Sequence, residues 1–74
     1  MNQPKKAIEF AEKWKEKAPK FSPYFNLKIA NIALESNTKR KLGLKAIQEY
    51  IKNYEEGLYI NLERAKEIEQ KLNR

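Results

Sequence analysis

The sequence contains no cysteine and no histidine, and only two glycines and three prolines among its 74 residues. Without cysteine the chain can form no disulfide, and without either residue type it lacks the usual ligands of zinc and iron–sulfur sites. The same absence removes the commonest general base and the commonest pairing of a nucleophile with its base. We therefore expect no catalytic residue, no metal site and no cofactor, and we predict that the protein is not an enzyme.

Long hydrophobic runs are missing as well. No apolar stretch approaches the roughly 20 residues that a membrane-spanning helix needs, and the first ten residues, MNQPKKAIEF, lack the hydrophobic stretch of a signal peptide. We expect a soluble, cytoplasmic protein with no membrane partner. The length predicts a single domain over residues 1–74 with modest stability, because so short a chain buries only about 60% of the surface that it exposes when unfolded.

Charge is abundant and unevenly distributed along the chain. Charged residues make up 35% of the sequence, and the formal net charge is +6. Residues 1–45 hold 11 lysines and arginines against 4 glutamates, a balance of +7, whereas residues 46–74 hold 5 against 6, a balance of −1. The basic character therefore belongs to the first three fifths of the chain.

Helical periodicity and helix-ending residues divide the chain into four segments. Pro4 suits a first helical position, Pro19 and Gly57 end helices, and Asn37 suits the left-handed residue that follows one. We predict an all-α fold of four antiparallel helices, joined by short connections, over residues 4–18, 23–36, 39–54 and 58–72. Ser22 and Thr38 are expected to cap the second and third helices with their side chains.

The apolar faces of these helices predict how they pack. In the first helix Ala7, Ala11, Trp14 and Ala18 form one stripe, which Ile8 and Phe10 widen, so we expect Trp14 in the core. The helix over 23–36 is apolar nearly all round and should be the central one. Gly43 should allow close packing against it. The helix over 58–72 has a narrower stripe beginning at Leu58, which is typical of a closing helix.

Three short runs resemble the tetratricopeptide repeat. AIEFAEKWKEKAP, residues 7–19, is similar to the second helix of such a unit, with its Ala-Ile-Glu-aromatic start and its closing proline. YFNLKIA, residues 24–30, resembles the opening of the first helix of the next unit, and KAIQEYI, residues 45–51, resembles its second helix. The resemblance implies a helical solenoid fragment with a carboxyl-terminal capping helix.

The resemblance also implies a function in protein–protein interaction. Members of that family bind a peptide or a partner protein in a groove lined by the first helix of each unit. Transferred to this chain, the groove candidates are Phe25, Asn26, Lys28 and Ile29; an asparagine there can bond a peptide backbone, and a lysine can attract a carboxylate. Because repeats are normally stacked in threes or more, a homodimer or the rest of a longer solenoid stays open as a partner.

A basic patch supports the alternative partner, nucleic acid. The run TKRKLGLK contains Lys39, Arg40, Lys41 and Lys45, and such a patch can contact phosphates. Proteins that bind single strands interleave exposed aromatic residues with the charge, whereas the nearest aromatic residues, Tyr50 and Tyr54, fall on the apolar stripe. The solvated start of a helix is therefore the simpler interpretation. A third alternative is a structural or engineered repeat fragment with no ligand of its own.

Overall fold

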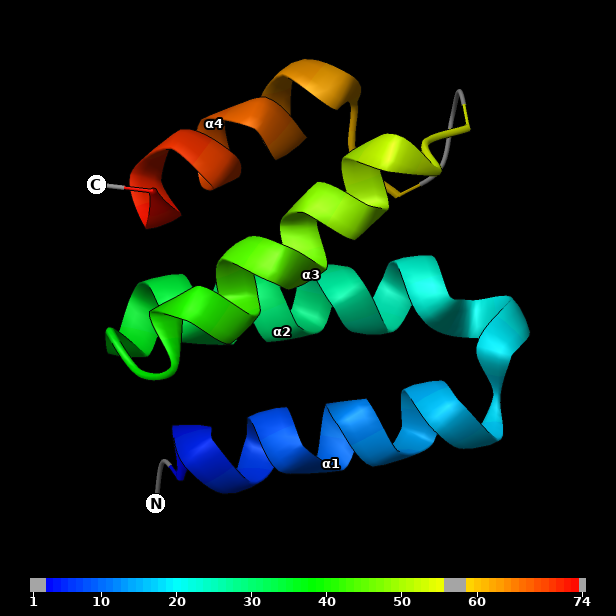
Figure 1. The fold of residues 1–74 in the computed structure, drawn as a ribbon, viewed down its shortest axis with the longest axis vertical. Helices are drawn as coiled ribbons and strands as arrows, with labels where there is room; N and C mark the ends of the chain where they lie inside the picture. Colours follow the sequence, from blue (N-terminus) through cyan, green and yellow to red (C-terminus); the bar gives the residue numbers. More distant parts are fainter. Residues whose placement is uncertain (1–2, 56–58, 74) are drawn as a thin grey trace.

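The computed structural model describes residues 3–55 and 59–73, and this part of the chain is helical with no β-strand. The elements follow one another as α1 (Pro4–Lys17), the 3₁₀ turn η1 (Pro19–Phe21), α2 (Ser22–Ser36), α3 (Arg40–Lys52) and α4 (Leu62–Leu72). Figure 1 shows the helices side by side in chain order, with the chain reversing direction at each connection. The prediction of an all-α fold is confirmed for these residues.

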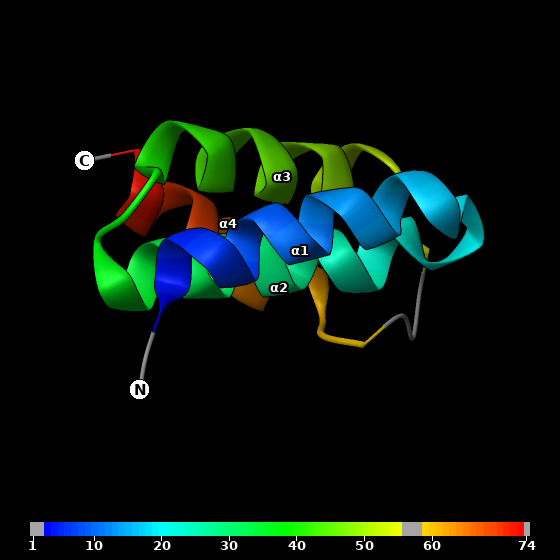
Figure 2. The same cartoon turned by 90° about the horizontal axis from the view of Figure 1, so that it is seen from below.

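The molecule is a slab, 34 × 31 × 18 Å, in which α2 is the central helix. α2 packs against α1, α3 and α4, as its nearly continuous apolar surface predicts. Seen from below, α1 lies in front of α2, and α3 lies to one side of that pair (Figure 2). The buried hydrophobic residues come from all four helices: Ile8, Ala11, Leu27, Ile29, Ala30, Ala33, Ala46, Ile47, Tyr50, Ala65, Ile68 and Leu72.

Gly43 explains how closely α3 approaches α2. A Cβ atom added at Gly43 would overlap with the Cβ atom of Ala33 on α2, and it would lie 3.5 Å from the methyl groups of Leu72 on α4. Glycine inside a helix costs about 0.5–1 kcal/mol relative to alanine. The close contact between backbones supplies the reason for accepting that cost, as the sequence predicts.

The turn between α2 and α3 is built from left-handed residues and not from side-chain caps. Asn37 has the predicted left-handed backbone (φ 55°), and Lys39 also has a positive φ of 49°. The predicted caps are wrong. The Ser22 hydroxyl donates to the carbonyl of Pro19 (2.7 Å), because α2 already begins at Ser22, and the Thr38 hydroxyl donates to the carbonyl of Ser36 (3.2 Å).

The last helix begins at Leu62, four residues later than predicted. Asn61 is its N-cap, and its side-chain oxygen accepts the backbone N–H of Arg64 at 2.8 Å. Tyr59 has φ 57°, a left-handed conformation that no right-handed helix continues. Gly57 and Leu58, which the sequence predicts to end one helix and begin the next, lie outside the described residues.

α1 turns only part of the predicted stripe toward α2. Ile8 and Ala11 are buried, but Ala7 is exposed and Trp14 is 49% exposed, so the prediction of a core tryptophan is wrong. The covered strip follows Ile8, Ala11 and Lys15, at spacings i, i+3 and i+7. Because the backbone of α1 lies close to that of α2 and to no other α-helix of the described chain, and α1 reaches α3 through the Lys15–Glu49 pair, this strip is narrow and leaves the neighbouring strip uncovered.

None of the helices in residues 3–55 and 59–73 has both the length and the apolar character needed to cross a lipid bilayer.

Candidate functional site

A groove runs between α2 and the start of α4. Its volume is about 520 Å³, against about 250, 320 and 260 Å³ for the three further hollows described below. Most of its wall comes from the outward face of α2, with Tyr59 and Arg64 contributed from the other side. The lining residues are Tyr24, Leu27, Lys28, Asn31, Ile32, Glu35, Tyr59 and Arg64.

Two tyrosines and two cations define the chemistry of this groove. The ring centroids of Tyr24 and Tyr59 are 5.7 Å apart, and both side chains are exposed. The ammonium of Lys28 lies 5.8 Å from the Tyr24 ring centroid, and Arg64, whose guanidinium is 3.6 Å from the Glu67 carboxylate, also lines the groove. Aromatic faces beside cations can hold an apolar side chain together with a carboxylate.

The four predicted groove residues do not share one surface. Lys28 is exposed and lines the groove. Phe25 is half-buried, with its ring against Tyr24 at a centroid distance of 5.4 Å. Asn26 and Ile29 are each only 2% exposed, and Ile29 lines a separate hollow between α1 and α3. On the outward face of α2 the amide that reaches the groove belongs to Asn31, a residue that the sequence reasoning missed.

Asn26 takes part in a polar cluster that joins three helices. Its side-chain amide donates to Glu49 Oε2 on α3 at 2.8 Å, and Lys15 Nζ on α1 lies 2.7 Å from the same oxygen. The hydrogen bond from Lys15, followed by that from Asn26, holds the pKa of Glu49 below its ordinary value. The Oδ1 atom of Asn26 is buried and has no hydrogen-bond partner within the described residues. The cluster links α1, α2 and α3.

A second hollow, of about 320 Å³, lies beside this cluster between α1 and α3. Its lining mixes carboxylates with ammonium groups, and Lys15 and Glu49 are already paired with each other. The lining residues are Glu12, Lys15, Glu16, Ser22, Ile29, Leu42, Lys45, Ala46 and Glu49. Across the described residues, no group of three or more acidic, histidine or cysteine side chains is placed to hold a metal ion.

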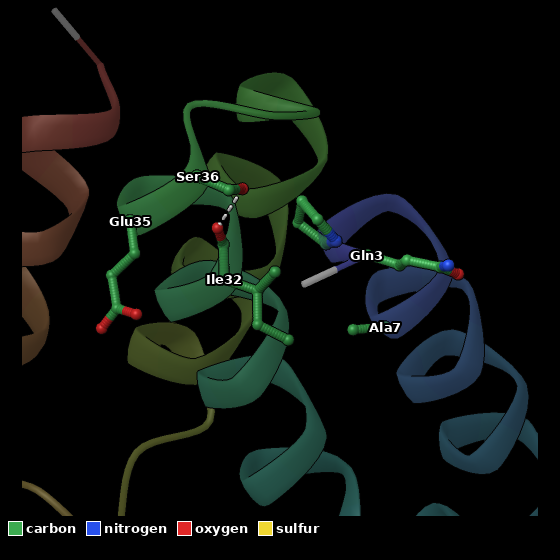
Figure 3. A pocket seen from close by; sticks show the side chains of 6 residues that line it. Gln3, Ala7, Ile32, Glu35 and Ser36 are labelled. Atoms are coloured by element: carbon green, nitrogen blue, oxygen red, sulfur yellow. Dashed lines mark hydrogen bonds between the residues drawn. The ribbon is translucent and has the colours of Figure 1, made fainter. Parts of the chain in front are cut away.

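A third hollow, of about 250 Å³, lies between the start of α1 and the end of α2. Figure 3 shows its floor of Ala7 and Ile32, with the Ser36 hydroxyl turned to the Ile32 carbonyl (2.5 Å) and the Glu35 carboxylate pointing away from α1. Its remaining lining residues are Gln3 and Pro4. Its polar groups do not converge on one point, so it is a weaker candidate for a ligand site than the groove between α2 and α4.

The four cations of the predicted basic patch lie in different surroundings. The Arg40 guanidinium donates to the carbonyl of Lys71 at the end of α4 (2.6 Å) and to the side-chain oxygen of Asn37 (3.1 Å). Lys39 Nζ lies 3.8 Å from the carboxylate of Glu9 on α1. Lys45 lines the hollow between α1 and α3, and Lys41 is exposed. Two of the four cations are thus engaged in contacts within the chain.

Comparison with protein-family models, curated proteins and solved structures finds no match to this chain. The functional argument therefore depends on the residues and on the geometry of the groove.

Proposed function

We propose that the protein is an interaction module of tetratricopeptide-like helical hairpins, and that it binds an extended peptide of a partner protein in the groove between α2 and α4. The reversal of the chain between successive helices supports this proposal (Figure 1). α2 corresponds to the first helix of a repeat unit, the helix that lines the groove in that family. Its outward face lines the groove here.

The single observation that carries the proposal is the meeting of Tyr24, Tyr59, Lys28 and Arg64 in one groove. Rigid aromatic side chains are the usual anchors of protein interfaces, and a cation beside them favours a partner with acidic residues. The Asn31 amide can pair with a peptide backbone, the role that the sequence assigns to Asn26. We expect the ligand to combine a carboxylate with an apolar side chain a few residues away.

A peptide selected by display tests this proposal. A labelled copy of the selected peptide should bind the protein saturably in fluorescence anisotropy, and Tyr24→Ala or Lys28→Ala should weaken the affinity by about tenfold or more, as expected for anchor residues. Both side chains are exposed, so the variants should keep the fold. Lys52→Ala, at the exposed end of α3, is the matched control and should leave the affinity unchanged.

The proposal would be wrong if the selected peptide bound Tyr24→Ala and Lys28→Ala as tightly as the parent. Equal weakening by Lys52→Ala would show that only net charge matters. No observation favours the alternative, nucleic acid bound at Lys39, Arg40, Lys41 and Lys45, because two of these side chains are engaged within the chain.

A further inference from the structure

The outer side of α1 carries exposed aromatic rings, among them Trp14, which the sequence predicts in the core. Phe10 is 63% exposed, Trp14 49% and Phe21, in the adjoining η1, 47%. α1 lies at the edge of the slab, with α2 along one side of it (Figure 1). Exposed large aromatic side chains in one row are unusual for a surface that has no partner.

Lysines accompany these rings along the helix. Lys6, Lys13 and Lys17 recur at i, i+7 and i+11 and so share one side of α1, next to the strip that holds Phe10 and Trp14. Lys17 Nζ lies 5.6 Å from the Trp14 ring centroid, and Lys20 Nζ lies 5.4 Å from that of Phe21. We call these residues the lysine–aromatic strip: Lys6, Phe10, Lys13, Trp14, Lys17, Lys20 and Phe21.

The charge of this part of the chain favours an anionic ligand. Residues 4–21 contain six lysines and three glutamates, a net charge of +3 (6 − 3). Two glutamates border the strip: Glu16, which also lines the hollow between α1 and α3, and Glu9, which lines a hollow of about 260 Å³ with Lys6, Phe10 and Lys13. The Glu9 carboxylate lies 3.8 Å from Lys39 Nζ, so its charge is partly offset from the side away from the strip.

We propose that the lysine–aromatic strip binds single-stranded nucleic acid. Sequence-tolerant binding of single strands combines cations that track the phosphates with aromatic rings on which bases stack. Phe10 and Trp14 are one helical turn apart, about 6 Å along the axis, and so are Lys13 and Lys17. This spacing suits successive nucleotides of an extended strand. Each ring next to a lysine can take a base while the lysine holds the adjoining phosphate.

The composition of the strip distinguishes this ligand from a membrane or an apolar helix of a partner protein. Ile8 is the only large aliphatic residue between Pro4 and Phe21, and it is fully buried. The exposed apolar surface of α1 therefore consists of separate rings and an alanine among charged residues. A helix that binds a lipid surface or docks on a partner helix buries a continuous apolar face, whereas stacking needs only separate flat rings.

Trp14 is the only tryptophan of the protein and reports directly on this surface. A short oligothymidylate should quench its fluorescence saturably. In anisotropy with the same oligonucleotide, Phe10→Ala and Trp14→Ala should each weaken binding about tenfold, because each removes one stacked base. The double variant Lys13→Gln with Lys17→Gln should make binding less sensitive to salt. The magnitude of the slope of log affinity against log salt should fall by about 1.4, because each of the two lost phosphate contacts to a single strand accounts for about 0.7.

The matched control is the double variant Lys52→Gln with Lys66→Gln, which removes the same charge from exposed positions on α3 and α4 and should leave the Trp14 quenching intact. Circular dichroism checks that every variant is folded. The proposal is overturned if Phe10→Ala and Trp14→Ala bind like the parent, since the attraction would then be generic charge. It is also overturned if heparin, polyglutamate or phosphatidylserine vesicles bind more tightly than the oligonucleotide with the same dependence on Trp14.

Discussion

The two edge helices, α1 and α4, bury similar residues but expose very different ones. α1 covers Ile8 and Ala11, and α4 covers Ala65, Ile68 and Leu72. On its open side α4 carries only charged and polar side chains: Glu63, Arg64, Lys66, Glu67, Gln70 and Lys71. The open side of α1 carries Phe10 and Trp14 among its charged side chains. A polar outer face is what closes a helical stack, so we infer that α1 is the better suited of the two edges to bind a partner.

Buried isoleucines should anchor both edges equally. Ile8→Ala and Ile68→Ala should each lower the free energy of unfolding by about 2–5 kcal/mol, measured by urea denaturation, because both leave a cavity against α2 or α3. Phe10→Ala and Lys66→Ala, on the open sides, should change it by less than about 0.5 kcal/mol. A loss for Phe10→Ala as large as that for Ile8→Ala would show that the Phe10 ring is packed, and the contrast between the edges would fail.

The centre of the slab should be less tolerant of added atoms than either edge. Gly43→Ala should cost about 1–3 kcal/mol of unfolding free energy, because the new methyl group overlaps with Ala33, even though alanine favours helix by about 1 kcal/mol over glycine. The compensating double variant, Gly43→Ala with Ala33→Gly, should recover part of the loss in thermal denaturation. Full tolerance of Gly43→Ala would mean that α2 and α3 can move apart freely.

Tyr50 joins α3 to the segment that precedes α4. Its hydroxyl donates to the carbonyl of Ile60 (3.1 Å) and accepts the backbone N–H of Ile60 (3.4 Å). Tyr50→Phe should therefore lower the free energy of unfolding by about 1 kcal/mol, whereas Tyr24→Phe, at an exposed ring, should not. Hydrogen exchange of the amides in α4 should speed up in the first variant; unchanged exchange would show that α4 docks independently of this bond.

The pH dependence of Tyr50 provides a second measurement. Burial raises the pKa of its phenol above the ordinary value of 10.0, so the folded state holds the proton more tightly than the unfolded state. This contribution to stability is present below pH 10 and is lost as the pH rises through the raised pKa. As the pH rises above 10, the free energy of unfolding should fall less steeply in Tyr50→Phe than in the parent. Identical profiles of stability against pH would contradict the assignment.

The smallest effect is expected at the ion pair that holds the α1 edge. The pKa of Glu49 lies below its ordinary value of 4.5, so its contribution to stability is present above that pH and is lost as the pH falls through the lowered pKa. Because its side chain is 42% exposed, we expect a coupling with Lys15 of only about 0.2–1 kcal/mol in a double-mutant cycle. Glu49→Gln should make the free energy of unfolding fall less steeply as the pH is lowered, and an unchanged acid profile would contradict the assignment.

The ends of α1 and α2 followed from local signals to within one residue, whereas the start of α4 and the side that each helix turns inward did not always follow. Pro4, Pro19 and Asn37 mark helix ends by their own backbone preferences, and these ends are where the sequence predicts them. On α1 two overlapping strips, one through Trp14 and one through Ile8, satisfy the same helical period. Which strip is buried depends on the width of the contact with α2, and that width is a property of the packed molecule.

The candidate site was harder to predict for the same reason. The contacts that bury Asn26 and engage Arg40 reach across 23 and 31 residues of sequence, so no local pattern contains them. The cap at Asn61 was within reach of the sequence, because asparagine is a preferred N-cap, but the apolar residues before it suggested an earlier start. The prediction for Lys28 needed only a local pattern. Lys28 follows Tyr24 by one helical turn, so both side chains lie on the outward face of α2 and line the groove.

The contact between Arg40 and the Lys71 carbonyl has a consequence for the order of folding. The guanidinium sits at the negative end of the α4 dipole and satisfies a carbonyl that has no partner inside its own helix. The final turn of α4 gains this contact only when the 37–39 turn has already aimed Arg40 across the slab. Completion of the last helix is thus coupled to a turn near the middle of the chain, which favours one concerted transition over stepwise addition of helices.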